Sequence, residues 1–138
     1  MPISIPKISD LIGITPKSTF HLAEIVEQGL PVDNLLLLRE RGLTFSEVSE
    51  IVISPRTLKH RKARGERLSK EETERVVRVA RIVTMANTVF ANLDKALLWM
   101  RSPDNRLNDR SPMSMLQTEA GARVVEDMLW QIDEGVYT

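Results

Sequence analysis

The chain has 138 residues, enough for one domain or two small ones, and its 42% hydrophobic content is ordinary for a globular protein. It has no cysteine, which excludes disulfides and thiolate metal sites, and His21 and His60 are far apart. We therefore expect no metal and no cofactor. The N-terminal residues form no signal peptide, and no stretch approaches about 18 apolar residues, so we expect a soluble cytoplasmic protein with no membrane partner.

The net charge is zero, but the charges are unevenly distributed. Residues 1–53 have 4 Lys/Arg against 7 Asp/Glu, residues 54–81 have 10 against 4, and residues 82–138 have 5 against 8. A local basic block in a neutral chain is typical of a DNA-contacting element, because Lys and Arg neutralise phosphates. A solvated helix face produces the same composition. The position of the block among the predicted helices therefore has to distinguish a DNA-contacting element from a solvated face.

Two helices are predicted before residue 43. Thr15-Pro16 is typical of an N-cap followed by proline at the first helical position, and this helix ends at Gly29. Pro31 opens a segment with four consecutive leucines that ends at Gly42. Because four leucines cover more than one face, this helix is either central to a small core or part of an oligomer contact. No stretch alternates apolar and polar residues long enough for a sheet, so we predict an all-α fold.

Residues 43–58 have the pattern of a helix, a turn and a second helix. Apolar residues at helical spacing predict the first helix. Ser54 is a good N-cap, and Pro55 fits the first position of the second helix, where its missing N–H costs nothing. Ile53 and Leu58 are spaced as a hydrophobic staple. The turn lacks the glycine that many helix-turn-helix motifs have.

The second helix of this motif has a basic outer face when Leu58 is directed inward. The N-terminal end of a recognition helix contacts base edges in the major groove, and the rest positions the helix on phosphates. We assign base contacts to Arg56, Thr57 and His60. We assign phosphate contacts to Lys59, Lys62, Arg64 and Arg67, and we expect Arg61 to pack inward. The alternative is an ordinary amphipathic surface helix.

A capping box of Ser69 and Glu72 opens a long helix that runs to about Asn92, some 22 residues or about 33 Å, and can belong to both halves of the chain. Its first turns have three arginines, which either extend the phosphate-contacting surface or pair with two neighbouring glutamates. The arginines are Arg75, Arg78 and Arg81, and the glutamates are Glu71 and Glu74.

Two further helices are predicted in the C-terminal part. Asp94 can cap a short helix that Ser102-Pro103 ends, and Thr118 begins a last helix that stops at Gly135. The apolar face of the last helix comprises Ala122, Val125, Leu129 and Ile132, widened by Val124, Met128 and Trp130. We expect Trp99 and Trp130 to be core residues rather than binding anchors.

Several runs in this sequence resemble the Xre/MbcA/ParS-type antitoxins, over about residues 20–138. They include RTLKHR at 56–61, ALLWM at 96–100, SPMSMLQTEAGA at 111–122 and IDEGVY at 132–137. The pattern P-x-x-x-L-x-T-x-x-G with the glycine-hydrophobic-aromatic ending is the more specific part. The helix-turn-helix part is shared with many regulators.

The resemblance implies a Xre/Cro-like helix-turn-helix module joined to a toxin-binding domain. It implies the antitoxin of a type II toxin–antitoxin pair, whose partner is a RES-domain toxin that degrades NAD and is blocked sterically near its active site. It also implies autoregulation through double-stranded DNA of its own promoter. Contacts with the toxin are then expected from Pro112, Met113, Leu116, Thr118, Glu119, Glu134, Gly135, Val136 and Tyr137. For Pro112, Thr118 and Gly135 the alternative is a purely conformational role at helix ends.

The residues themselves are compatible with this interpretation. We expect an acidic surface from Glu126, Asp127, Asp133 and Glu134, suited to a basic cleft on a partner. A recognition helix covers few base pairs, so we expect a homodimer. We divide the chain into an N-terminal arm (1–15), a DNA-binding domain (16–81) and a toxin-binding domain (82–138).

Two other classes of function would need different features in the sequence. An enzyme is not expected, because no histidine–carboxylate pair, Gly-rich phosphate loop or metal-ligand cluster occurs. A dimeric transcriptional repressor without a toxin partner is the alternative that remains, and it differs mainly in what residues 94–138 bind.

Overall fold

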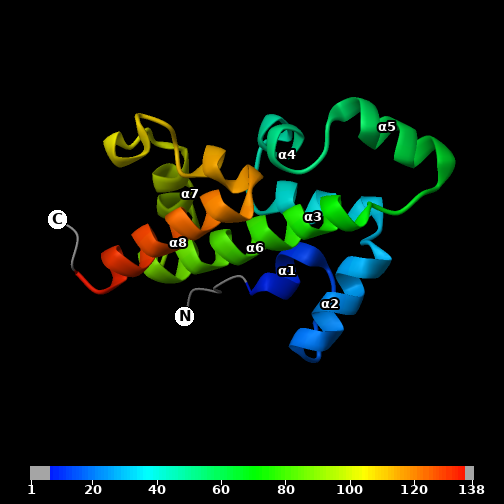
Figure 1. Cartoon of the computed structure of the whole chain (residues 1–138), viewed down its shortest axis with the longest axis horizontal. Coiled ribbons are helices and arrows are strands. Elements are labelled where there is room, and N and C mark those ends of the chain that lie inside the picture. Colours follow the sequence, from blue (N-terminus) through cyan, green and yellow to red (C-terminus); the bar gives the residue numbers. More distant parts are fainter. Residues whose placement is uncertain (1–6, 136–138) are drawn as a thin grey trace.

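Helix α6 (Lys70–Phe90) is the axis of the computed structural model, which describes residues 7–135 (Figure 1). It packs against α1, α2, α7, α8 and the short helix η3. Its apolar residues Val76, Val79, Ala80, Val83 and Ala86 are buried, whereas Phe90 at its end is half-buried. Ser69 and Glu72 form the predicted capping box, and the left-handed Ala91 ends the helix. The long helix therefore belongs to both halves of the chain, as expected.

The described part of the chain is helical, with no strand between residues 7 and 135, which confirms the all-α prediction. Its helices are α1 (Ile8–Ile12), α2 (Thr19–Gln28), η1 (Val32–Asn34), α3 (Leu35–Glu40), α4 (Phe45–Ile51), α5 (Pro55–Arg64), α6, α7 (Leu93–Arg101), η2 (Asn105–Leu107), η3 (Met113–Gln117) and α8 (Glu119–Asp133).

Three helix starts differ from the prediction. The segment expected to be an arm contains helix α1, whose Leu11 and Ile12 are fully buried. Helix α2 is capped by Ser18, whose hydroxyl accepts the His21 N–H at 3.0 Å, and not by Thr15. Helix α7 is capped by Asn92 rather than Asp94. For α2 and α7, more than one polar residue near the start has cap chemistry, and the fold uses Ser18 and Asn92.

The chain segments that flank α2 and α6 cross closely. The Leu68 N–H donates to the Leu30 carbonyl at 2.9 Å, and the buried Thr73 hydroxyl accepts the Leu30 N–H at 3.1 Å. A Cβ at Gly29 would collide with the Leu68 carbonyl oxygen, so only glycine fits this crossing. The crossing fixes the N-terminal helices against α6.

One hydrophobic core runs through the described residues, from Leu11 in α1 to Leu129 in α8. Of the four consecutive leucines in α3, Leu35 and Leu38 are buried in this core, whereas Leu36 is 58% exposed. The leucine helix therefore contributes to the core and leaves one side chain on the surface. Figure 1 shows α7 and α8 at one end of the molecule and α5 at the other.

Candidate functional site

The helix-turn-helix forms as predicted. Helix α4 has a capping box of Thr44 and Glu47, and Ser54 caps α5 by accepting the Thr57 N–H at 3.2 Å. Proline 55 occupies the first position of α5. The turn residues Val52 and Ile53 are both buried, so hydrophobic packing fixes this turn without a glycine.

The outer face of α5 is exposed and basic. Arg56, Lys59, His60, Lys62 and Arg64 are exposed, and none of these five side chains has a hydrogen bond or ion pair with another residue between 7 and 135. No residue of α5 is fully buried, and the helix protrudes from one end of the molecule (Figure 1). The arrangement leaves its N-terminal end free to approach a duplex.

Two residues that were assigned DNA contacts have partners within the chain. Thr57 is half-buried, and its hydroxyl accepts a hydrogen bond from the Ser54 hydroxyl at 2.9 Å. Arg67 lies beyond α5 and donates to the Gly29 carbonyl at 3.0 Å, although the residue as a whole is exposed. Both side chains therefore stabilise the local fold.

Arg61 anchors α5 to α6. Its Nε and Nη2 donate to the two carboxylate oxygens of Glu72 at 2.9 and 3.1 Å, and Nη1 lies 3.4 Å from Glu66. Burial raises the pKa of Glu72, but the hydrogen bonds from Arg61 and from the Ser69 N–H, with the Arg61 charge, outweigh it and leave this pKa below its ordinary value. The expected inward packing of Arg61 is confirmed.

The expected pairing of the α6 arginines with Glu71 and Glu74 was wrong, and their expected contact with phosphates stays a prediction. Arg78 and Arg81 bind Glu119 at the start of α8, at 3.3 and 2.6 Å, and Arg75 donates to the Val52 carbonyl at 3.2 Å. None of the three is paired with Glu71 or Glu74, and their guanidinium groups hold α4 and α8 against α6. Sequence spacing favoured pairs along one helix, whereas the tertiary fold provided carboxylates and carbonyls from other elements.

A second unpredicted ion pair joins α4 to α7. Arg101 donates to both carboxylate oxygens of Glu47, at 2.7 and 2.8 Å, and also to the Gly42 carbonyl at 2.6 Å. Burial raises the pKa of Glu47, but the hydrogen bonds from Arg101 and from the Thr44 N–H lower it by more than burial raises it. The pKa of Glu47 therefore lies below its ordinary value. The residues are 54 positions apart, so no local pattern could have revealed the pair.

The P-x-x-x-L-x-T-x-x-G pattern builds the junction of η3 and α8. Pro112, Met113 and Leu116 are buried, and the Thr118 hydroxyl caps α8 by accepting the Gly121 N–H at 3.0 Å. A Cβ at Gly121 would collide with the Met115 carbonyl oxygen, so η3 packs directly on the backbone of α8. Pro112, Met113 and Leu116 therefore shape the domain and are covered by the chain itself, whereas Thr118 is exposed at the start of α8.

The other residues expected to contact a toxin are differently placed. Glu119 is half-buried in its arginine pairs, and Glu134 and Gly135 are exposed after the end of α8. Gly135 has a φ of 70°, in keeping with a helix-terminating role. Val136 and Tyr137 lie outside the described residues.

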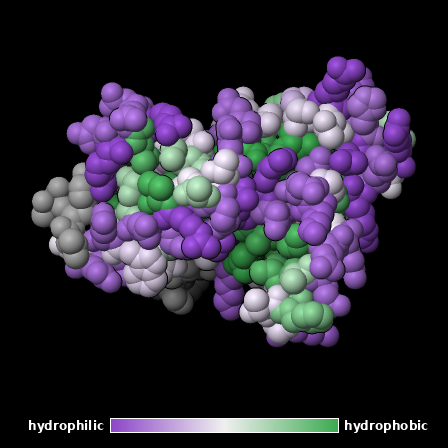
Figure 2. All heavy atoms as spheres, viewed as in Figure 1, coloured by the Kyte–Doolittle hydropathy of each residue, from purple (hydrophilic) through white to green (hydrophobic). Residues whose placement is uncertain are grey.

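Large apolar side chains are exposed on α7 and α8. Leu98 is 68% exposed, Trp130 53% and Val124 40%. Trp130 is therefore not a core residue, contrary to expectation, and neither it nor Val124 widens the buried stripe of α8. Trp99 is half-buried and packs on Phe90, with ring centroids 5.7 Å apart, which agrees with a core role. Figure 2 shows apolar surface over this end of the molecule.

The expected acidic surface is only partly free. Asp127, Asp133 and Glu134 are exposed, but Glu126 is half-buried with its carboxylate 3.7 Å from Arg81. Asp127 and Asp133 are each three residues from Trp130 along α8, and Asp127 is also three residues from Val124. We call Leu98, Val124 and Trp130, with Asp127 and Asp133, the C-terminal surface.

Within residues 7–135, no group of three or more His, Cys, Asp or Glu side chains is arranged to hold a metal ion. No single described helix is long and apolar enough to cross a membrane. Helices α6 and α7 meet that test only as a pair, and they are bent by 116° at the break between them.

Two family matches cover most of the chain. Residues 21–81 match the family described as the antitoxin Xre-like helix-turn-helix domain. Residues 85–135 match the antitoxin Xre/MbcA/ParS C-terminal toxin-binding domain. The first range includes α4 and α5, and the second includes α7, α8 and the whole C-terminal surface.

Individual relatives agree with these matches. The chain is 37% identical to antitoxin Xre of Pseudomonas putida over 118 residues, which is 86% of this chain and 74% of that protein. It is 30% identical to antitoxin Xre of Photorhabdus laumondii, over 91% of this chain and 86% of the relative. Among solved structures, a chain of the Mycobacterium tuberculosis MbcT–MbcA toxin–antitoxin complex matches with a TM-score of 0.54 and 29% identity, covering 73% of this chain and 90% of that one.

Proposed function

Because this chain belongs to the Xre antitoxin family, we propose that it neutralises a toxin through its C-terminal helices and binds its own promoter through α4 and α5. The toxin is a RES-domain enzyme that degrades NAD, encoded beside the antitoxin as a type II pair. The protein acts in the cytoplasm as a homodimer. We propose residues 16–81 as the DNA-binding domain and residues 82–138 as the toxin-binding domain.

The observation that carries the toxin-binding part is the C-terminal surface. Two of its side chains, Leu98 and Trp130, are more than half exposed, although a stable monomer gains by burying them. Aromatic and aliphatic anchors of this kind supply most of the binding energy at protein interfaces. The nearby Asp127 and Asp133 favour a partner with a basic surface, such as a cleft that binds the phosphates of NAD.

The family resemblance suggested direct toxin contacts for several residues that the fold buries, and this proposal gives those residues a supporting role. Because Pro112, Met113 and Leu116 are buried, we propose that they support the toxin interface by shaping η3 and α8. Direct contacts come from the exposed side chains of α7 and α8 and from the end of the chain after Glu134.

The DNA-binding part rests on the free basic face of α5. Arg56 and His60 are exposed near its N-terminal end, where side chains of a recognition helix reach base edges. Lys59, Lys62 and Arg64 are placed along the same helix to contact phosphates. A repressor without a toxin partner would use this face equally well, but it would leave the C-terminal surface without a function.

Co-expression with the adjacent toxin gene tests the proposal. Cells that produce the toxin alone are expected to lose NAD and stop growing, and cells that also produce this chain are expected to grow with normal NAD. Purification of a tagged copy should recover the toxin with it. If the chain neither protects the cells nor retains the toxin, but still binds the promoter fragment in a mobility-shift assay, the repressor alternative is correct.

A further inference from the structure

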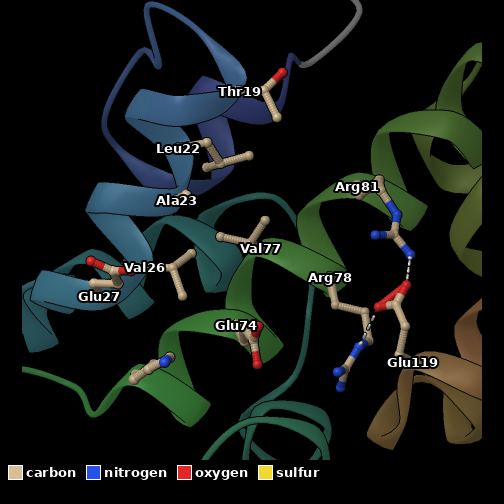
Figure 3. A pocket seen from close by; sticks show the side chains of 11 residues that line it. Thr19, Leu22, Ala23, Val26, Glu27, Glu74, Val77, Arg78, Arg81 and Glu119 are labelled. Atoms are coloured by element: carbon tan, nitrogen blue, oxygen red, sulfur yellow. Dashed lines mark hydrogen bonds and ion pairs between the residues drawn. The ribbon is translucent and has the colours of Figure 1, made fainter.

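A groove of about 470 Å³ lies between α2 and α6 and ends at the start of α8. Figure 3 shows Leu22 and Val26 of α2 and Val77 of α6 directed toward one another across it, with Arg78, Arg81 and Glu119 at one side. The floor of this groove is apolar and its rim is charged. None of its lining residues belongs to α5 or α7.

Helix α2 is more apolar than its burial requires. It has the apolar residues Phe20, Leu22, Ala23, Ile25 and Val26, but only Ile25 is buried, and Phe20 is 74% exposed. A surface helix normally turns its apolar stripe into the core. Figure 2 shows an apolar cluster on the surface over α2 and the adjacent part of α6. Exposed clusters of this kind mark interaction sites.

The rim of the groove has unpaired charges of both signs. Lys70, Glu27 and Glu74 are exposed, and none of them has an ion-pair partner among residues 7–135. In a two-fold dimer the same patch occurs on both subunits, so a patch that pairs with itself has to present both charges. Lys70 of one copy can then approach Glu27 or Glu74 of the other.

We propose that a second copy of this chain occupies the groove, with α2 of each protomer packed on α2 and α6 of the other. The inference rests on the homodimer proposed above and adds the face through which it forms. The toxin is a poorer occupant, because Leu22, Val26 and Val77 lie outside the range that matches the toxin-binding domain. Figure 1 shows α5 and α2 at opposite edges of the molecule, so this dimer leaves both recognition helices uncovered.

Sedimentation of the full chain tests this face. Ala23→Glu places a carboxylate on the exposed groove side of α2, and Phe20→Ser removes the largest exposed side chain of that helix. We expect each substitution to raise the dimer dissociation constant by about tenfold or more, because an unpaired charge or a lost aromatic anchor weakens a buried contact. Circular dichroism should show unchanged helix content for both variants.

Matched controls use the same substitutions at exposed positions outside the groove. Ala120→Glu on α8 and Phe45→Ser on α4 should sediment like the wild type. If Ala23→Glu and Phe20→Ser both remain dimeric, the dimer uses another face and only this inference fails. If the wild type is a monomer, the proposed dimer fails as well. If the groove variants remain dimeric but lose the toxin in co-purification, the groove binds the toxin.

Discussion

At the residue scale, the basic block of residues 54–81 contains side chains with two different roles. Arg61, Arg78 and Arg81 bind carboxylates of this chain, and their guanidinium groups connect helices. Arg56 and Lys59 are exposed without such partners. The net charge of this block therefore overestimates the basic surface that is free for a partner, because several of its arginines bind carboxylates inside the fold.

Substitutions on α5 should separate base contacts from phosphate contacts. We expect Arg56→Ala or His60→Ala to weaken binding to a promoter fragment by about 1 to 3 kcal/mol, and to weaken binding to random duplex less. Lys62→Ala should weaken both to a similar extent, because phosphates are the same in every sequence. Fluorescence anisotropy titrations with the two duplexes measure this, and Lys95→Ala on α7 is the control. Equal losses for all three α5 variants would refute the base-contact assignment.

The Arg61–Glu72 pair should make stability depend on pH. The pKa of Glu72 lies below its ordinary value of 4.5 in the folded state, so the unfolded chain binds the proton first as pH falls. We expect Glu72→Gln to cost about 1 to 3 kcal/mol at pH 7, and the difference from wild type to shrink as pH falls below 4.5 toward the folded pKa. Urea unfolding at a series of pH values measures this.

Glu66→Gln is the matched control, because Glu66 is more exposed and contacts the same arginine at 3.4 Å. Its effect should be about 0 to 1 kcal/mol, as for other surface pairs. A pH-independent difference between wild type and Glu72→Gln would show that the carboxylate charge is not what stabilises α5.

At the element scale, α2 and α8 show that an apolar stripe is not always directed into the core. Helix α8 buries Ala122, Val125 and Leu129 completely, while Val124 and Trp130 face outward. The hydrophobic periodicity identified both helices, but it could not distinguish a face that packs on α6 from a face that remains for a partner. In both α2 and α8 the apolar stripe is wider than one neighbouring helix can cover.

Changes on the C-terminal surface should relieve toxin inhibition without affecting DNA binding. We expect Trp130→Ser, and truncation before Gly135, to lower protection in the co-expression assay, because buried apolar surface contributes about 25 cal/mol per Å² to an interface. Arg56→Ala should protect fully, since distant sites usually contribute independently. Growth and cellular NAD are the readouts. Full protection by Trp130→Ser together with loss of protection by Arg56→Ala would reverse this assignment of roles.

At the scale of the whole molecule, the two matched ranges share one core. Helix α6 begins beside the helix-turn-helix and ends beside α7, and its buried face contacts elements of both halves. The Glu47–Arg101 and Arg78–Glu119 pairs add contacts between distant segments. The basic face of α5 and the C-terminal surface are therefore connected through one core, although each is formed by different side chains.

The shared core predicts a single unfolding transition. Both tryptophans, Trp99 and Trp130, lie in the C-terminal helices, so their fluorescence reports on that half while far-UV circular dichroism reports on all helices. We expect the two urea curves to coincide. Leu38→Ala, in the N-terminal core, should shift both equally by about 2 to 5 kcal/mol. A fluorescence midpoint that does not move would mean that the halves unfold separately.

The sequence by itself determined the helical class, the long α6 with its cap at Ser69, the helix-turn-helix at Ser54-Pro55 and the start of α8 at Thr118. These features depend on caps, prolines and periodicity, which act over a few residues. Only the tertiary structure decided that Arg78, Arg81 and Arg101 bind distant carboxylates, that Pro112 and Leu116 are buried, and that Trp130 and Phe20 are exposed. The physical reason is that burial and ion pairing depend on which elements meet in space, and in this chain those elements lie tens of residues apart.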